Sequence, residues 1–274
     1  MSETASQTNL QFEYDKLYKT NKELIDSIYY AESVQQGVLP NARHFKRIFD
    51  QHLILYKPQG IVGGDLYWIG QKGKVKYFAV GDCTGHGISG AMLSVLALSF
   101  LNYIVLGKDF ESVGQILQEL DKKWIETFHQ GSEHGYNNDW LEIGICSINE
   151  ETNELQYAGA FNKLVCINKD GELTEIAGNK YPIGGWQLEK NRVYTTHVLP
   201  IEKGTMLYLN SDGFKDQFGF LSKKRFSNKR FKDLLLQSFH LSIEEQKEKI
   251  EYEFNCWKGI EEQTDDMCVL GIRI

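Results

Sequence analysis

The sequence is poor in cysteine and proline, with five cysteines and four prolines among 274 residues. No two cysteines form a Cys-x-x-Cys pair, and none stands at the spacing of a zinc site, which argues against a zinc motif. Cys146, Cys166 and Cys268 stand in apolar, strand-like runs, so we expect them in the core. This usage of cysteine is typical of reduced thiols in a cytosol.

The sequence also lacks an excess of positive charge. It contains 30 lysine and arginine residues against 37 aspartate and glutamate residues, a formal net charge of -7. Contacts with nucleic-acid phosphates need concentrated lysine and arginine, whereas the basic cluster between Lys223 and Lys232 is local. The charge balance therefore argues against a nucleic-acid-binding protein.

Long apolar runs and targeting segments are a third absence. We interpret the sequence as having no apolar run that approaches the ~20 residues of a membrane span. The N-terminal segment MSETASQTNLQFEYDK lacks the basic and then apolar pattern of a signal peptide. These features predict a cytoplasmic protein with no membrane span.

The N-terminal region has a pattern of its own. Residues 1–9 are small and polar and are predicted to be a disordered tail, and residues 10–40 are predicted to form a helix and linker. From Leu10 to Gln36 the apolar positions recur in alternating steps of four and three, which is a heptad pattern. Leucine occupies successive d positions, at Leu10, Leu17 and Leu24, and the a positions hold Tyr14, Asn21 and Ile28.

A lone polar residue such as Asn21 at an a position often fixes a parallel two-stranded pairing. The heptad pattern therefore predicts a homodimer through this helix. The alternative is that the same apolar stripe packs on the protein's own folded domain, because the pattern is shorter than four heptads.

Residues 41–274 are predicted to form one folded domain. Short β-rich runs are separated by glycine, aspartate and proline, and the segment AMLSVLALSFLNYIVL is apolar almost all round, as a buried helix is. Further helices are expected at about 110–128 and 228–257. The pattern predicts an α/β (α+β) sandwich in which two central, mostly antiparallel sheets are flanked by helix pairs.

Four acidic motifs fall at the ends of predicted strands: GGD at Asp65, GDC at Asp82, SDG at Asp212 and TDD at Asp265. Carboxylates that converge at one edge repel one another unless cations lie between them. Hard oxygen ligands favour Mg²⁺ or Mn²⁺, and two such ions can activate a water for attack on phosphorus. Each aspartate alone could equally cap a turn, but four in this order are hard to explain that way.

Read together, GGDLYWI, FAVGDCTGHGISGAMLS, AGAFNKL, PIGGW, LYLNSDGFKDQFG and TDDMCVLGIRI resemble the SpoIIE/RsbU branch of the PPM (PP2C-like) serine/threonine phosphatases. The resemblance covers roughly residues 34–274. It implies that Asp82 bridges two Mn²⁺ or Mg²⁺ ions, that Asp65 supports one of them, and that Asp212 and Asp265 ligate the other. It also implies a ligand from the backbone carbonyl of Cys83 and a supporting role for the neighbouring Asp266.

Other residues of these motifs have competing interpretations. His86 could donate a proton to the leaving serine oxygen, or it could shape the loop before the buried helix. Cys83 is not the nucleophile of a cysteine phosphatase, because the Cys-x5-Arg cradle would need arginine where Ser89 stands. Asn162 is interpreted as a turn residue. No arginine near the first aspartate motif is placed to clamp a phosphate, and Phe220 stands where related sequences are rich in glycine.

Three functions compete on this sequence. The favoured one is a metal-dependent phosphatase acting on phosphoserine or phosphothreonine of a regulatory partner, which the resemblance implies is often a STAS-type anti-sigma-factor antagonist. The second is a regulatory binding module with the same fold and no turnover. The third, a GGDEF-type nucleotide cyclase, fails because Leu66 and Tyr67 follow the GGD motif in place of the acidic and aromatic pair.

Overall fold

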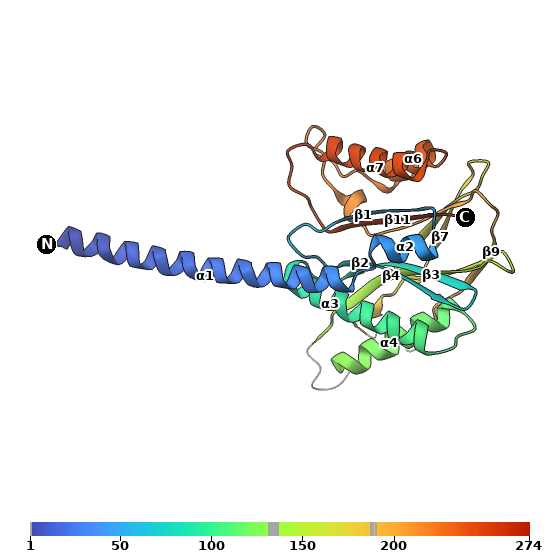
Figure 1. Cartoon of the computed structure of the whole chain (residues 1–274), viewed down its shortest axis with the longest axis horizontal. Helices are drawn as coiled ribbons and strands as arrows, with labels where there is room; N and C mark the ends of the chain where they lie inside the picture. Colours follow the sequence, from blue (N-terminus) through green and yellow to red (C-terminus); the bar gives the residue numbers. More distant parts are fainter. Residues whose placement is uncertain (1, 131–136, 187–188, 190) are drawn as a thin grey trace.

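The computed structural model describes residues 2–130, 137–186, 189 and 191–274. Two β-sheets pack face to face at its centre, and helices cover the outer face of each sheet (Figure 1). This arrangement confirms the predicted sandwich of two antiparallel sheets flanked by helix pairs.

The first sheet has five strands in the order β1-β11-β10-β6-β7, and every neighbouring pair is antiparallel. Its strands are β1 (His52–Lys57), β11 (Met267–Arg273), β10 (Met206–Asn210), β6 (Lys163–Ile167) and β7 (Leu173–Ala177). Helices α6 (Asn228–Ser238) and α7 (Ile243–Lys258) cover its outer face, where Phe231 and Phe254 are fully buried. A tight turn at Asp170 and Gly171 joins β6 to β7, with Gly171 at a φ of 83°.

The second sheet has the strand order β2-β3-β4-β5-β9, with a short β8 paired to β4. Its strands are β2 (Asp65–Lys72), β3 (Val75–Cys83), β4 (Trp140–Asn149), β5 (Glu154–Ala160), β8 (Ile183–Gly184) and β9 (His197–Pro200). Its outer face is covered by α3 (Gly87–Leu101), the π-helical turn η1 (Asn102–Leu106) and α4 (Val113–Phe128). Helix α4 begins three residues later than predicted, because the Ser112 side chain caps it.

The space between the two sheets is filled by alternate residues of the facing strands, as the two-residue period of a strand requires. Phe78 and Val80 of β3 meet Leu209 of β10 and Leu270 of β11 there, all of them buried. A short helix that the sequence did not predict, α2 (Ala42–Ile48), closes one edge of this layer with Phe45. The two sheets are thereby fixed against each other, and so are the loops at their ends.

The segment Gly87–Leu106 corrects one expectation from the sequence. It is 20 residues long with a mean hydropathy of 1.8, so by length and composition it could span a membrane. It was therefore wrong to expect that no apolar run approaches that length. In the structure 56% of this segment is buried inside the protein, where it packs on the second sheet as the predicted core helix.

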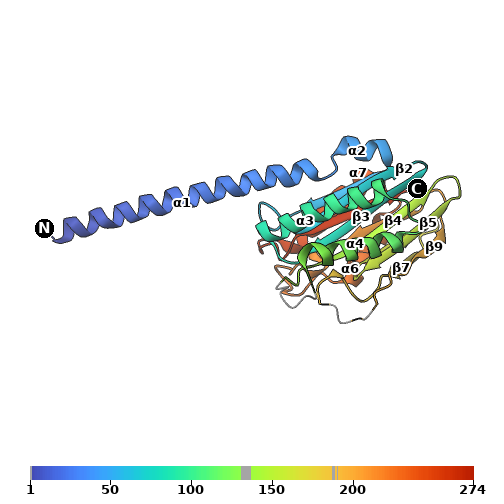
Figure 2. The same ribbon diagram turned by 90° about the horizontal axis from the view of Figure 1, so that it is seen from below.

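Helix α1 (Ser2–Val38) projects away from the folded body as one straight rod (Figures 1 and 2). It begins at Ser2 and so includes residues 2–9 of the predicted tail, while Met1 lies outside the described residues. The heptad leucines are exposed, so the stripe does not pack on the protein's own domain. Only the last turns of α1 reach the body, where Gln35 is buried.

Candidate active site

Three carboxylates stand side by side across adjacent strands of the second sheet. Asp65 opens β2 and lies directly opposite Asp82, near the end of β3. On its other side Asp82 lies opposite Glu142 of β4. Residues directly opposite each other in an antiparallel pair share a face of the sheet, so the three side chains point the same way. Strand register therefore groups Asp65, Asp82 and Glu142.

Asp212 and Asp265 come from the first sheet. Asp212 follows β10 and Asp265 precedes β11, and these two strands are antiparallel neighbours. A Cβ on Gly213 would lie 1.9 Å from the carbonyl oxygen of Asp266, so only glycine allows the two segments to approach this closely. The pairing brings both aspartates to the end of the sandwich at which Asp82 lies.

Burial and mutual repulsion raise the pKa of every one of these acids. For Asp65 the burial of the carboxyl group is the main cause, and the charge of Asp82 comes second. Burial also raises the pKa of Asp82, to about 8, with further contributions from Asp212 and Asp265. The pKa of Glu142 is raised by burial and then by Asp212. Carboxylates of the two sheets thus interact across one shared site.

The residues present fit divalent cations. Asp65 Oδ1 and Asp212 Oδ1 are buried without a hydrogen-bond partner. Burying an unpaired carboxylate oxygen costs free energy unless a cation binds to it. All the donors are hard oxygens, as Mg²⁺ and Mn²⁺ prefer. Among the described residues, however, no group of three or more acidic, histidine or cysteine side chains already forms a ligand cluster. Because the acids come from two sheets, metal ions bound between them would have to bring their side chains closer together.

Neighbouring residues fix the position of Asp65. The Asp266 carboxylate accepts hydrogen bonds from the backbone N–H groups of Gln59 and Gly64, each at 2.6 Å. The Ser211 hydroxyl donates to Asp65 Oδ2 at 2.5 Å. Asp266 therefore holds the loop that carries Asp65, in agreement with the supporting role expected for it, and Ser211 links Asp65 to the first sheet.

The end of α1 also contacts this loop. The buried Gln35 side chain donates to the Gly63 carbonyl at 2.7 Å and to the Ser94 hydroxyl of α3 at 2.8 Å. The Gly63 N–H donates in return to Gln35 Oε1 at 3.4 Å. A buried amide with three such bonds ties α1, α3 and the Gly63-Gly64-Asp65 loop together. The sequence analysis placed Gln35 only on the heptad, because nothing in the sequence marks its partners.

Cys83, the last residue of β3, and His86, the residue before α3, lie in a pocket that Asp82 and Asp265 also line. The His86 side chain is exposed and does not cap the helix. Burial raises the pKa of the Cys83 thiol well above its ordinary value, which is the opposite of what a cysteine nucleophile needs. A Cβ on Gly64 would lie 2.8 Å from the Cys83 carbonyl oxygen, so glycine keeps this proposed backbone ligand accessible.

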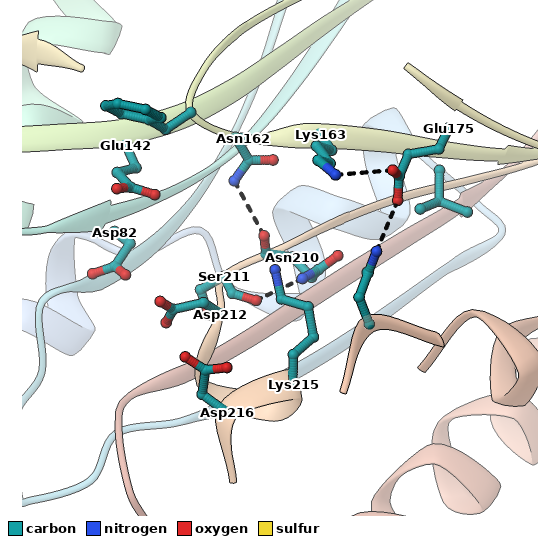
Figure 3. Close-up of a pocket in the computed structure, with 13 residues that line it drawn as sticks. Asp82, Glu142, Asn162, Lys163, Glu175, Asn210, Ser211, Asp212, Lys215 and Asp216 are labelled. Carbon is teal, nitrogen blue, oxygen red and sulfur yellow. Dashed lines mark hydrogen bonds and ion pairs between the residues drawn. The ribbon is translucent and has the colours of Figure 1, made fainter. Parts of the chain in front are cut away.

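A second pocket opens beside Asp82 and Asp212 on the side of β6 (Figure 3). Asn162 lies at its inner end, where its amide donates to the Asn210 carbonyl at 3.1 Å and joins β6 to β10. Asn162 Oδ1 is buried without a hydrogen-bond partner, so the turn role expected for Asn162 stays a prediction. Glu142 and Lys215 are among the charged residues of this pocket that the sequence analysis did not single out. An acidic residue near the start of an otherwise apolar strand was the available signal for Glu142.

The fold is that of the PP2C-type phosphatases. The family model of stage II sporulation protein E (SpoIIE) matches residues 72–274, more than half of the chain, so the protein belongs to the SpoIIE family. This confirms the resemblance drawn from the motifs. The matched segment begins after Asp65 and includes the other three metal-ligand candidates, Asp82, Asp212 and Asp265.

Solved structures agree with this assignment. The SiaA-PP2C domain of Pseudomonas aeruginosa is 28% identical, with a TM-score of 0.83 over 93% of this chain and 98% of that one. The PP2C phosphatase domain of SpoIIE from Bacillus subtilis, solved with a fragment of its regulatory domain, is 15% identical, with a TM-score of 0.66 over 82% of this chain and 63% of that one. The RsbU and RsbW domains of Rv1364c from Mycobacterium tuberculosis are 16% identical, with a TM-score of 0.63 over 81% of this chain and 59% of that one. The comparison with curated proteins gives no match.

Proposed function

We propose that this protein is a metal-dependent serine/threonine phosphatase that hydrolyses a phosphoserine or phosphothreonine on a partner protein. The observation that carries the proposal is the convergence of Asp65, Asp82, Asp212 and Asp265, with two buried and unpartnered carboxylate oxygens among them. Membership of the SpoIIE family supports it. An inactive binding module is the weaker alternative, because every carboxylate that the family pattern requires is present.

The proposed roles follow from position. Asp82, between Asp65 and Glu142 and facing Asp212, is the acid best placed to be shared by two Mn²⁺ or Mg²⁺ ions. Asp212 and Asp265 would hold one ion and Asp65 would support the other, together with the Cys83 carbonyl. When bound, the two ions supply charge neutralisation and a water of lowered pKa for in-line attack at phosphorus.

His86 is the proposed proton donor to the leaving serine oxygen. It is exposed at the rim of the pocket that Asp82 and Asp265 line, within reach of solvent and of a bound substrate. Histidine is the side chain most often used to transfer a proton in catalysis near neutral pH. Its role as a loop residue before α3 remains the competing interpretation, and a His86→Gln variant with unchanged kcat at all pH values would favour it.

The proposed substrate is a phosphorylated regulatory protein of the STAS type, and the proposed compartment is the cytoplasm. The solved structure that contains both the RsbU and the RsbW domains of Rv1364c supports the proposal of a regulatory protein partner. Helix α1, with its exposed heptad leucines, is proposed to form a parallel homodimer.

One assay tests the reaction. Purified protein is expected to hydrolyse a phosphoserine peptide and para-nitrophenyl phosphate when Mn²⁺ is added, and to lose this activity in EDTA. Iodoacetamide should have little effect, because the Cys83 thiol is buried. Hydrolysis that persists in EDTA, or that substrate protects from iodoacetamide, would contradict the proposal, and cyclic nucleotides formed from GTP would favour the cyclase.

A further inference from the structure

The two lysines that line the pocket beside Asp82 and Asp212 differ in their partners. Lys163 Nζ lies 2.9 Å from Glu175 Oε1 and forms an ion pair. Lys215 forms no ion pair with any carboxylate in the part of the chain that the structure describes, and Figure 3 draws no bond from it. Its side chain rises from α5 (Gly213–Asp216) into the pocket toward the end of β10 (Figure 3).

The backbone under Lys215 is fixed on both sides. Phe214 is fully buried, and its ring packs on Phe226 with the ring centroids 5.0 Å apart. The Lys215 N–H donates to the Asp212 carbonyl at 2.9 Å, and the Lys215 carbonyl accepts from the Ser227 N–H at 2.8 Å. Since neighbouring residues of a helical turn point in different directions, burial of Phe214 leaves Lys215 facing the pocket.

The acidic residue that follows Lys215 in the sequence does not form an ion pair with it. Asp216, the next residue, pairs with Arg225 at 3.0 Å. Lys215 lines the same pocket as Asp212, at the end of the first sheet, and Glu142, on the second sheet (Figure 3). Its side chain therefore stands beside the acids of both sheets, in the pocket that a substrate phosphoryl group would enter.

A phosphomonoester carries about two negative charges and must enter a pocket whose charged residues are mostly carboxylates. Bound metal ions would offset part of that repulsion, and the sequence offers no arginine near its first aspartate motif to offset the rest. We propose that Lys215 binds a non-bridging oxygen of the substrate's phosphoryl group and so supplies the phosphate clamp of this site. A lysine ammonium is suited to this role as a compact, mobile charge with three donors. The inference rests on the proposed phosphatase function and adds a substrate contact to it.

The competing role for Lys215 is that of a counter-ion which only reduces repulsion among the acids. The two roles predict different measurements. A counter-ion affects the thermal stability of the metal-free protein and the affinity for Mn²⁺, but not the affinity for phosphate. A phosphate clamp affects the inhibition constant of inorganic phosphate and the KM of a phosphopeptide.

The test compares Lys215→Met and Lys215→Arg with Lys229→Met, which removes the same charge from an exposed position on α6. With saturating Mn²⁺, Lys215→Met should raise both the phosphate inhibition constant and the phosphoserine-peptide KM about 10- to 100-fold, the usual worth of a hydrogen bond to a charged group. Lys215→Arg should restore most of the affinity, and Lys229→Met should stay within about twofold of wild type. Calorimetry of Mn²⁺ binding measures the counter-ion role separately.

An unchanged phosphate inhibition constant in a folded, active Lys215→Met protein would overturn the inference, whatever its stability. If that variant does not fold, Lys215→Gln provides the same comparison with a polar side chain. The proposed function fails separately, if wild type shows no Mn²⁺-dependent hydrolysis. In that case calorimetric titration of Mn²⁺-loaded wild type and Lys215→Met with inorganic phosphate still tests the contact.

Discussion

The two ends of helix α1 belong to different environments. Toward the N-terminus, Leu10, Leu17 and Leu24 are 74%, 69% and 58% exposed, whereas Gln35 and Leu39 at the other end are 1% and 5% exposed. The heptad of α1 thus runs from exposed leucines to Gln35, which is buried against α3 and the Gly63 loop. The inner end is stabilised by the folded domain, and the outer end requires another molecule to bury its apolar side chains.

The largest expected effect lies inside the folded body. Asp82→Asn should reduce kcat at least 100-fold, because the shared carboxylate loses its charge toward both ions while its size is kept. Circular dichroism should find the fold intact. A variant that keeps more than about a tenth of wild-type kcat, a loss below ~1.4 kcal/mol in the barrier, would contradict the assignment of Asp82.

The contact between α1 and the body should carry an intermediate effect. Gln35→Leu leaves the Gly63 carbonyl without its buried donor, which should lower the free energy of unfolding by about 1–3 kcal/mol. If the contact also positions Asp65, the affinity for Mn²⁺ should fall several-fold in calorimetry. Gln36→Leu, at the exposed neighbouring position, is the matched control. Equal Mn²⁺ affinities in the two variants would limit Gln35 to a structural role.

The carboxylates should also make the metal-free body sensitive to pH. Burial raises the pKa of Asp82 to about 8, so the folded state binds its proton more tightly than the unfolded state does. Ionisation of Asp82 therefore destabilises the fold, and this cost grows as pH rises from the unfolded pKa near 4 to the folded one. In EDTA, the melting temperature should rise by a few degrees from pH 8 to pH 6. Asp82→Asn should flatten this dependence and melt higher at pH 8, and a steeper slope in the variant would contradict it.

The smallest effect on turnover is expected from the outer part of α1. Deleting residues 1–30 removes the exposed leucines and keeps Gln35, so the protein should fold as a monomer with activity reduced a few-fold. Light scattering and steady-state kinetics measure both quantities. A full-length protein that stays monomeric at high micromolar concentration, or a deletion that still dimerises with unchanged turnover, would contradict dimerisation through α1. Asn21→Leu keeps the helix but removes the polar residue at an a position. This variant tests whether Asn21 fixes the register of the two helices or is needed for their pairing.

Much of the candidate site could be predicted because its aspartates are recognisable from the residues next to them in the sequence. Asp82 stands at the end of an apolar strand, and Asp212 follows an apolar strand and precedes Gly213, so both lie at a sheet edge wherever the strand lies. Glu142 and Lys215 could not be recognised in this way. Glu142 is recognised from strand register, since it stands opposite Asp82. Lys215 is recognised because it lines the pocket without an ion pair to any carboxylate of the described residues.

The sequence by itself determined the alternation of strands and helices, the four aspartate motifs and the heptad of α1, because each depends on periodicity or on residues adjacent in the chain. Only the tertiary structure decided that the heptad leucines stay exposed and that Gln35 reaches Gly63. These outcomes depend on which surfaces meet when distant segments pack. Burial and hydrogen bonding between such segments are set by the whole fold, and a single stretch of sequence does not contain them.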